Sequence, residues 1–339
     1  MKEAMFWEEM GNGKVRCELC RHRCVIYEGK IAVCGVRINK GGKLFSLVYG
    51  NPIAMHVDPI EKKPLFHFYP GTTSFSIATV GCNMKCSNCQ NWDISQYKFD
   101  KQKNKVKNSW VTPEEIVKMT MEKKCKTISY TYTEPTIFFE WAYDISKLAS
   151  EKKIYNIFVT NGYMSEIALK TISPYLHGAN VDLKSFRENF YHKIPGAKLK
   201  GVLESIKLMK KYGIWVEITT LLIPTLNDSK EEIRDIARFI KEEIGPETPW
   251  HISRFYPNYK LLNLPPTELR SIRKARDIGV TEGLKFVYGG NVPGDEAENT
   301  YCPNCKTLLI ERYGYTILKN RVSKGKCPEC QEKIEGVGL

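Results

Sequence analysis

The chain has 339 residues, of which 42% are hydrophobic and 26% are charged. This composition is ordinary for a soluble globular protein. No apolar run approaches the roughly 20 residues that a membrane-spanning helix needs, and the first residues lack the apolar core of a secretory signal. We therefore expect a cytoplasmic protein with no membrane partner, long enough for a barrel-sized core with small appendages.

The formal net charge of +13 raises the question of a nucleic-acid partner. That charge counts every cysteine as a neutral thiol, and metal–thiolate sites would lower it. RNA or another acidic partner therefore stays open, but the charge does not establish one.

Twelve cysteines in a cytosolic chain favour metal sites over disulfides. All of them except Cys125 fall into three groups along the chain. The groups are Cys17, Cys20, Cys24 and Cys34; Cys82, Cys86 and Cys89; and Cys302, Cys305, Cys327 and Cys330.

Residues 1–73 form a cysteine-rich segment with glycine-rich turns. Its four cysteines could bind zinc, and a [4Fe–4S] cluster, separate from the one considered below for the second cysteine group, fits their spacing as well. His22 stands among them and could replace one thiolate. The metal of this segment is left open between these two alternatives.

The second cysteine group follows an alternating apolar run, Ser74 to Val80, which predicts a β-strand. Cys82, Cys86 and Cys89 are then spaced C-x3-C-x2-C on the loop after that strand. Three thiolates can hold a [4Fe–4S] cluster by three of its irons and leave the fourth iron open to a small molecule. The alternative is a zinc site whose fourth ligand lies elsewhere.

From residue 74 to 290 strand-like and helix-like segments alternate, which predicts parallel strands joined by crossover helices. Further strands are expected at 127–132, 155–160, 179–183, 215–223, 250–255 and 285–288. Thr112, Ser229 and Thr267 are expected to begin helices, the last of them ending at Gly279. The fold class is therefore α/β, with a partial (β/α)6-type barrel over residues 74–290.

Polar side chains end these strands one after another, and in parallel barrels chemistry takes place at those strand ends. Any one of them has an ordinary explanation as a cap or a turn. A series of polar residues at the ends of successive strands, on the same rim of the barrel, predicts a binding site. These residues are Thr133, Glu134, Thr160, Asn161, Asp182, Lys184, His251 and Arg254.

Residues 291–339 carry two C-x2-C pairs about twenty residues apart, each with a proline after its first cysteine. Cys302, Cys305, Cys327 and Cys330 thus predict a zinc-ribbon-like segment in which zinc has a structural role. Iron of the rubredoxin type is the alternative.

The cysteine loop resembles the signature of the radical SAM superfamily. With Thr-Glu-Pro after the second strand, Thr-Asn-Gly after the third and Asp-Leu-Lys on the fourth, it resembles the pyruvate formate-lyase activating enzyme group. The N-terminal cysteines, the segment Tyr288-Gly-Gly-Asn-Val-Pro293 and Tyr301-Cys-Pro-Asn-Cys305 are similar to the AmmeMemoRadiSam system radical SAM enzyme family. The resemblance covers essentially the whole chain.

This resemblance implies roles for individual residues. Cys82, Cys86 and Cys89 would hold the catalytic [4Fe–4S] cluster, whose open iron binds S-adenosylmethionine (SAM). Thr133 and Glu134 would take the ammonium group of SAM, and Lys184, beside Asp182, would pair with its carboxylate. Thr160 and Asn161 would lie near the ribose and the methionine moiety, while His251 and Arg254 could touch SAM or the substrate.

Two positions depart from the family pattern. The residue before the third cysteine is usually aromatic and packs by the adenine, but here it is Asn88, and Trp92 is proposed to supply the stacking instead. Val159 replaces the acidic residue that precedes Thr-Asn-Gly in the activase. A cation site carried over from the activase is therefore not expected.

The implied activity is reductive cleavage of SAM to methionine and a 5′-deoxyadenosyl radical that abstracts hydrogen from a substrate. A reduced ferredoxin or flavodoxin would supply the electron. The substrate could be a residue of a partner protein, as in the activase. The alternatives are an RNA or nucleoside substrate, and a non-catalytic iron–sulfur or zinc scaffold.

Overall fold

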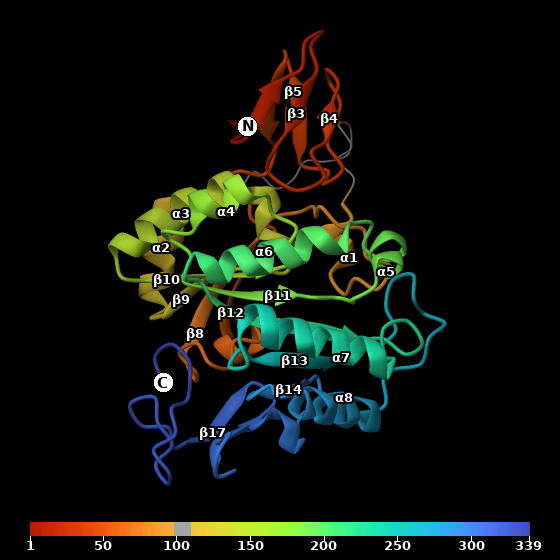
Figure 1. Cartoon of the computed structure of the whole chain (residues 1–339). Helices are drawn as coiled ribbons and strands as arrows, with labels where there is room; N and C mark the ends of the chain where they lie inside the picture. The colour runs from red at the N-terminus through yellow and green to blue at the C-terminus, as the bar shows by residue number, and fades with distance from the viewer. Residues whose placement is uncertain (98–109) are drawn as a thin grey trace.

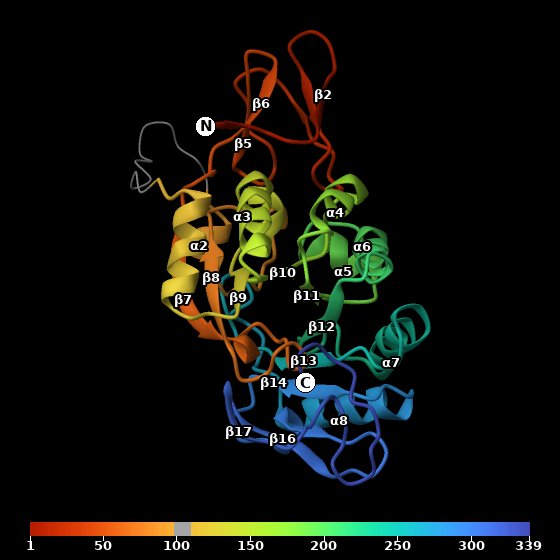
Figure 2. The same ribbon diagram turned by 90° about the vertical axis from the view of Figure 1, so that its left-hand side faces the viewer.

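The computed structural model describes residues 1–97 and 110–339. At its centre lies a sheet of seven parallel strands in the sequential order expected for β/α units. Figures 1 and 2 show the helices lying outside these strands. The parallel strands are β8 (Thr73–Ala78), β9 (Thr127–Tyr130), β10 (Tyr155–Thr160), β11 (Gly178–Asp182), β12 (Trp215–Leu222), β13 (Trp250–Arg254) and β14 (Val287–Gly290).

One strand from the N-terminal segment joins this sheet. β7 (Ala54–Pro59) pairs antiparallel with β8 and forms one edge, while β14 forms the other. The α/β partial barrel predicted from the sequence is thus confirmed. The boundary at residue 73 does not coincide with the sheet, because the segment before it supplies β7.

Helices connect the parallel strands. The expected capping box at Thr112 is present, with the Thr112 hydroxyl accepting from the Glu115 N–H and the Glu115 carboxylate accepting from the Thr112 N–H. Ser229 likewise caps its helix by accepting from the Glu232 N–H. The helices are α1 (Trp92–Ser95), α2 (Pro113–Glu122), α3 (Phe139–Glu151), α4 (Glu166–Ile172), α5 (Glu188–Lys193), α6 (Leu199–Lys211), α7 (Lys230–Phe239), which continues into a π-turn at Ile240–Ile244, and α8 (Leu269–Thr281).

Two of the predicted boundaries are wrong. Thr267 does not cap α8, because its hydroxyl donates to the Leu222 carbonyl and accepts from the Phe255 N–H, which joins neighbouring strand ends. The helix also continues past Gly279 to Thr281. Gly279 lies where α8 packs against Trp250, and a Cβ atom there would stand 3.1 Å from the indole ring.

The N-terminal segment folds into two small antiparallel sheets above the barrel, visible at the top of Figure 1. They consist of β1 (Lys2–Glu3), β6 (Lys43–Ser46) and β5 (Arg37–Lys40), and of β2 (Trp7–Glu9), β3 (Val15–Cys17) and β4 (Val25–Ile26). Val15, Leu19 and Ile26 belong to the same buried apolar cluster as the barrel core. This segment is therefore packed against the barrel through a continuous core.

The C-terminal segment packs against the opposite end, next to β14 and α8 (Figure 1). Its strands are β15 (Thr300–Tyr301), β16 (Leu308–Tyr313) and β17 (Thr316–Asn320). A second buried cluster joins Leu309 and Ile310 of this segment to Phe66, Phe286 and Tyr288 of the barrel. Among the described residues, no helix combines the length and apolar content that a membrane span requires.

A buried ion pair joins the N-terminal segment to the barrel. Arg37 donates to the Glu140 carboxylate at the start of α3, and both side chains are at most 2% exposed. The same carboxylate accepts from the Met5 N–H over 2.7 Å. Loss of one partner would leave the other charge buried without compensation.

We predict that Glu140→Gln lowers the free energy of unfolding by about 3–5 kcal/mol, because Arg37 would remain charged in an apolar environment. The double variant Arg37→Met/Glu140→Met should regain a large part of this loss. Urea unfolding followed by circular dichroism measures both. Lys118→Met, in an exposed pair with Glu122, is the control and should change stability by less than about 1 kcal/mol. Wild-type stability of Glu140→Gln would contradict the prediction.

Candidate functional site

A cavity of about 510 Å³ lies at the C-terminal ends of the barrel strands. Loops after β8 to β11 and residues of β12, β13 and β14 form its wall. The structure brings ten of the sequence-predicted residues to this wall. They are Cys82, Cys86, Asn88, Cys89, Thr133, Thr160, Asn161, Asp182, Lys184 and His251.

The three cysteines follow a tight turn at Gly81. Gly81 has φ 98°, and a Cβ atom there would meet Val36 at 2.7 Å and the Cys34 carbonyl at 2.8 Å. Glycine is therefore required both by the backbone conformation and by the N-terminal segment packed behind the loop. The loop then turns into α1, where the Ser95 hydroxyl lies 3.1 Å from the Cys89 sulfur.

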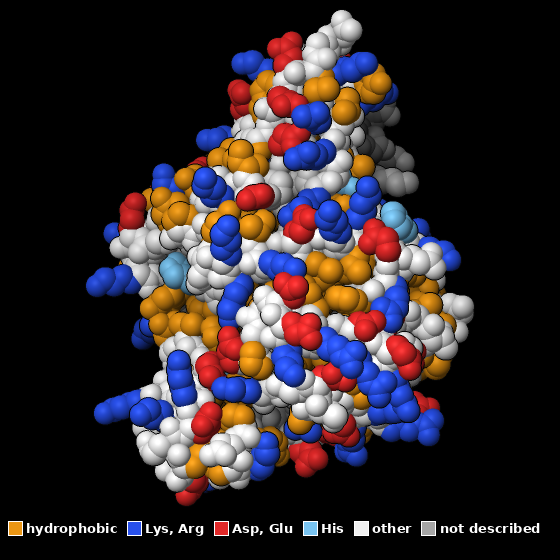
Figure 3. All heavy atoms as spheres, viewed as in Figure 1, with side chains coloured by type: hydrophobic (Ala, Val, Ile, Leu, Met, Phe, Trp, Pro, Cys, Tyr) orange, Lys and Arg blue, Asp and Glu red, His pale blue; other side chains and the backbone are white. Residues whose placement is uncertain are grey.

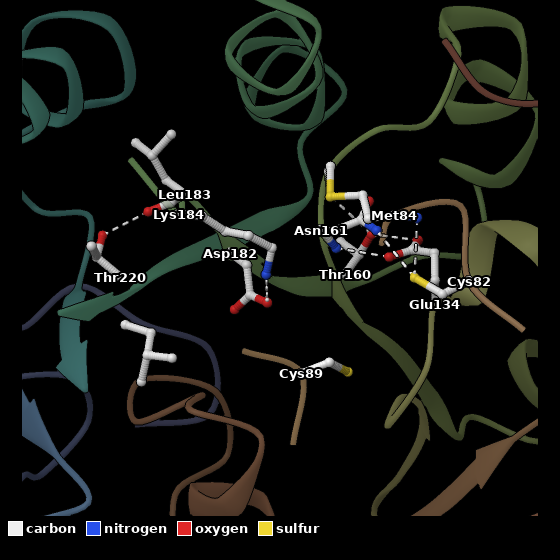
Figure 4. A network of polar contacts seen from close by, with 12 residues as sticks. Cys82, Met84, Cys89, Glu134, Thr160, Asn161, Asp182, Leu183, Lys184 and Thr220 are labelled. Atoms are coloured by element: carbon white, nitrogen blue, oxygen red, sulfur yellow. Dashed lines mark hydrogen bonds and ion pairs between the residues drawn. The ribbon is translucent and has the colours of Figure 1, made fainter. Parts of the chain in front are cut away.

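Polar hydrogen atoms are directed at the Cys82 sulfur. The Met84 N–H donates to it over 3.4 Å, and the Asn161 Nδ2 lies 3.8 Å away (Figure 4). Burial raises the pKa of Cys82, and it raises the pKa of Cys86 to about 11. Buried thiols of this kind become thiolates when a cation binds them, since the metal ligand is the deprotonated sulfur. The donor set thus fits a metal or an iron–sulfur cluster.

Glu134 joins the ends of β9 and β10. One carboxylate oxygen accepts from the backbone N–H and the hydroxyl of Thr136. The same oxygen accepts from the Thr160 hydroxyl, and the other accepts from the Asn161 N–H over 2.8 Å (Figure 4). Burial raises the pKa of Glu134, and these donors partly offset that effect. Its carboxylate is fully buried and does not line the cavity, so its partners indicate a positioning role.

Asp182 and Lys184 form an ion pair on the cavity wall, with 2.7 Å between Nζ and Oδ2 (Figure 4). Burial by itself would lower the pKa of Lys184, but Asp182 and Cys86 more than offset it, so the pKa is raised. Lys184 therefore stays charged, with 19% of its side chain exposed. A charged pair of this kind can bind the ammonium and carboxylate groups of an amino acid.

His251 lines the cavity from β13, and its Nε2 lies 2.7 Å from the buried Glu217 carboxylate. Glu217 also accepts from the backbone N–H groups of Phe66 and His67. It therefore holds the segment after β7 against the barrel.

Besides Glu134, two sequence-predicted residues lie away from the cavity wall. Trp92 is 45% exposed and stacks on Tyr259 at 5.2 Å between ring centroids. Arg254 donates to the Thr267 carbonyl over 2.7 Å, and its guanidinium lies over the Tyr256 ring. Neither contributes to the cavity wall.

Comparison with known proteins identifies this arrangement. The family model of the radical SAM superfamily matches residues 76–240, which begin in β8 and end after α7. An uncharacterised protein of Methanocaldococcus jannaschii is 47% identical over 337 residues and is aligned over 99% of both chains.

The chain belongs to the radical SAM superfamily.

More distant relatives include activating enzymes. The pyruvate formate-lyase-activating enzyme of Clostridium pasteurianum is 29% identical over 48% of this chain and 66% of its own length. A putative glycyl-radical enzyme activating enzyme of M. jannaschii is also 29% identical, over 51% of this chain and 71% of its own length. The crystal structure of Streptococcus suis SuiB bound to SAM shares the fold, with a TM-score of 0.51 at 13% identity over 68% of this chain and 53% of that chain.

Membership of the radical SAM superfamily implies a [4Fe–4S] cluster and SAM. The three thiols at the cavity wall and the charged pair beside them fit these groups. Cys82, Cys86 and Cys89 are the residues that would hold the cluster.

The sequence did not predict that the segment after β7 forms part of the cavity wall. Glu61 lines the cavity and has one buried carboxylate oxygen without a partner among the described residues. Lys63 lines it too, 2.7 Å from Asp58, and burial lowers its pKa to about 8. Nothing in the sequence distinguishes these residues from surface charges, because Glu217, which anchors the segment, is about 150 residues away.

The C-terminal segment also reaches the cavity, through Glu298, Gly314 and Tyr315. Its four cysteine sulfurs all lie within 4.8 Å of one another, so this segment can hold a metal ion as predicted. The short Cys302–Cys330 and Cys305–Cys327 sulfur distances, 3.5 and 3.6 Å, suit one tetrahedral ion.

We predict that Glu134→Gln lowers the free energy of unfolding by about 1–3 kcal/mol, because an amide NH₂ group cannot accept the bonds that the carboxylate accepts. Denaturant unfolding measures this loss. Glu166→Gln at the exposed start of α4 is the matched control and should be close to wild type. If Glu134 binds the ammonium group of SAM instead, the variant will have wild-type stability and a raised KM for SAM.

Proposed function

We propose that the protein cleaves SAM reductively and takes a hydrogen atom from a substrate. The observation that carries this proposal is a shared cavity, since the three cluster-binding thiols and the Asp182–Lys184 pair line the same space. When bound, the cluster would deliver one electron to the sulfonium of SAM, which then releases methionine and a 5′-deoxyadenosyl radical.

The residues of the wall divide the recognition of SAM among them. Lys184 would pair with the carboxylate of the methionine moiety. Asp182 and the loop at Thr133 would receive its ammonium group, because Glu134 is buried away from the cavity wall and accepts from backbone and hydroxyl donors instead. Thr160 and Asn161 would lie near the ribose and the methionine moiety.

Asn88 stands before the third cysteine of the loop, where the family usually has an aromatic residue that packs by the adenine. It would offer the adenine a hydrogen bond in place of stacking. Its Oδ1 is buried on the cavity wall without a partner among the described residues. That oxygen could accept a hydrogen bond from the adenine amino group. Apolar wall residues, Phe66, Leu221 and Ile223, would keep water away from a reactive radical.

The proposed substrate is a residue of a partner protein, as the distant resemblance to activating enzymes favours. Buried acceptors without partners at Glu61 and Thr219 on the described wall suit the N–H donors of a polypeptide. RNA or a nucleoside is the second candidate because of the charge of +13. On the face in Figure 3, however, basic and acidic side chains are interspersed, with no continuous basic stripe to follow a phosphate backbone.

Reduced ferredoxin or flavodoxin is the proposed electron donor, and the cytoplasm is the compartment in which such donors act. Zinc is the proposed metal of the C-terminal segment. We further propose that the chain is an AmmeMemoRadiSam system radical SAM enzyme, on the strength of the motifs at both ends of the sequence.

Anaerobically reconstituted protein with dithionite should convert SAM to 5′-deoxyadenosine, measured by liquid chromatography. Cys86→Ala should give none above background, because two thiolates cannot position the cluster. Cys125→Ala, outside the three cysteine groups, should match wild type. Equal 5′-deoxyadenosine formation by Cys86→Ala and wild type would refute the proposal and favour a non-catalytic scaffold.

The substrate class can be tested by mass spectrometry of proteins and of digested RNA from cells with and without the gene. A protein modification should be missing from the deleted strain and restored by wild type, but not by Cys86→Ala. A missing nucleoside with an unchanged proteome would overturn the protein-substrate proposal and establish the RNA alternative.

A further inference from the structure

The four N-terminal cysteines surround one small enclosed space that the proposed SAM chemistry does not use. Cys17 ends β3, Cys20 and Cys24 lie in the turn before β4, and Cys34 precedes β5. All four line the same cavity. Residues 17 and 24 are held together by a backbone hydrogen bond of 2.9 Å.

These sulfurs lie beside a buried cation. The Arg37 guanidinium lies 4.0 Å from the Cys17 sulfur, and the side chains of Cys17 and Cys34 are themselves buried. Four sulfurs that share one enclosed space beside a buried guanidinium suit a metal centre, because metal ligands are deprotonated thiolates.

The distances between the sulfurs distinguish a single zinc ion from a [4Fe–4S] cluster, the two alternatives for that centre. A single zinc with Zn–S bonds of about 2.3 Å draws its four sulfurs to within about 3.8 Å of each other. The C-terminal group shows this spacing, with all four sulfurs within 4.8 Å of one another. Across residues 1–97 and 110–339, no other group of three cysteines meets that limit.

The sulfurs of the N-terminal cysteines are therefore less closely grouped than those of the C-terminal group, and the same holds for Cys82, Cys86 and Cys89. In a [4Fe–4S] cluster each thiolate binds a different iron at a corner of a cube, so the sulfurs stand farther apart than around one ion. We propose that Cys17, Cys20, Cys24 and Cys34 hold a second [4Fe–4S] cluster. This proposal does not depend on SAM cleavage.

The second site lies directly behind the catalytic loop. The His22 ring nitrogen is 2.7 Å from the Asn83 carbonyl oxygen, and Asn83 follows Cys82. Asn83 also lines the N-terminal cavity, and its side chain accepts from Asn161 over 2.7 Å. One layer of residues therefore separates the two cysteine sites.

The test uses the full-length triple variant Cys82→Ala/Cys86→Ala/Cys89→Ala, which cannot hold the catalytic cluster. Purified anaerobically without reconstitution, it should contain about four irons per chain and about one zinc. After dithionite reduction it should show the electron paramagnetic resonance signal of a reduced [4Fe–4S] cluster. About two zincs and no iron, or no metal in the N-terminal site, would overturn the proposal.

Two further variants of the triple mutant assign the metals. Adding Cys20→Ser and Cys24→Ser should remove the iron and leave the zinc, and retention of the iron would overturn the proposal. Adding Cys305→Ser and Cys330→Ser instead should remove the zinc and leave the iron. If wild type fails to cleave SAM while the triple variant holds four irons, the proposed function fails and this inference stands.

Discussion

The site depends on one buried carboxylate. Glu134 receives donors from the segment after β9 and from the end of β10, and through Asn161 it is linked to the cysteine loop after β8. Parallel strands have no hairpins to fix their ends relative to one another, so side chains at the rim must do so. Other rim contacts support the same loops, since the Thr133 hydroxyl donates to the Thr79 carbonyl over 2.8 Å and the Asn91 amide donates to the Tyr132 carbonyl over 2.7 Å.

The two cysteine-rich segments pack against opposite ends of the barrel. The N-terminal segment supports the back of the cluster loop, where Gly81 has no room for a side chain beside Val36. The C-terminal segment supports the other wall, where the buried Arg312 donates to the carbonyl of Phe66 over 3.1 Å. Both ends of the chain therefore contribute to the shape of the cavity, although the family match covers only residues 76–240.

Charge at the cavity is balanced locally. Lys184 is paired with Asp182, and Lys63 is paired with Asp58. Each of these bases is thus compensated before any ligand arrives, which limits the cost of burying it. Glu61 differs, since one of its oxygens has no partner on the described wall. Together with Asn88 and Thr219 on the same wall, Glu61 offers a buried acceptor to a donor group of a ligand.

The sequence by itself determined the order of strands and helices, the cysteine loop and most of the rim. These features depend on local patterns, namely alternating apolar residues, capping residues and short cysteine spacings. It also placed Asp182 and Lys184 together, because they are only two residues apart where β11 ends.

Only the tertiary structure decided which rim residues face the cavity. Glu134 turned inward to the strand ends, Trp92 paired with Tyr259, and Arg254 bonded to Thr267. It alone also brought Glu61 and Lys63 to the wall. The partners involved include residues far away in the sequence, and local pattern carries no information about contacts between distant segments.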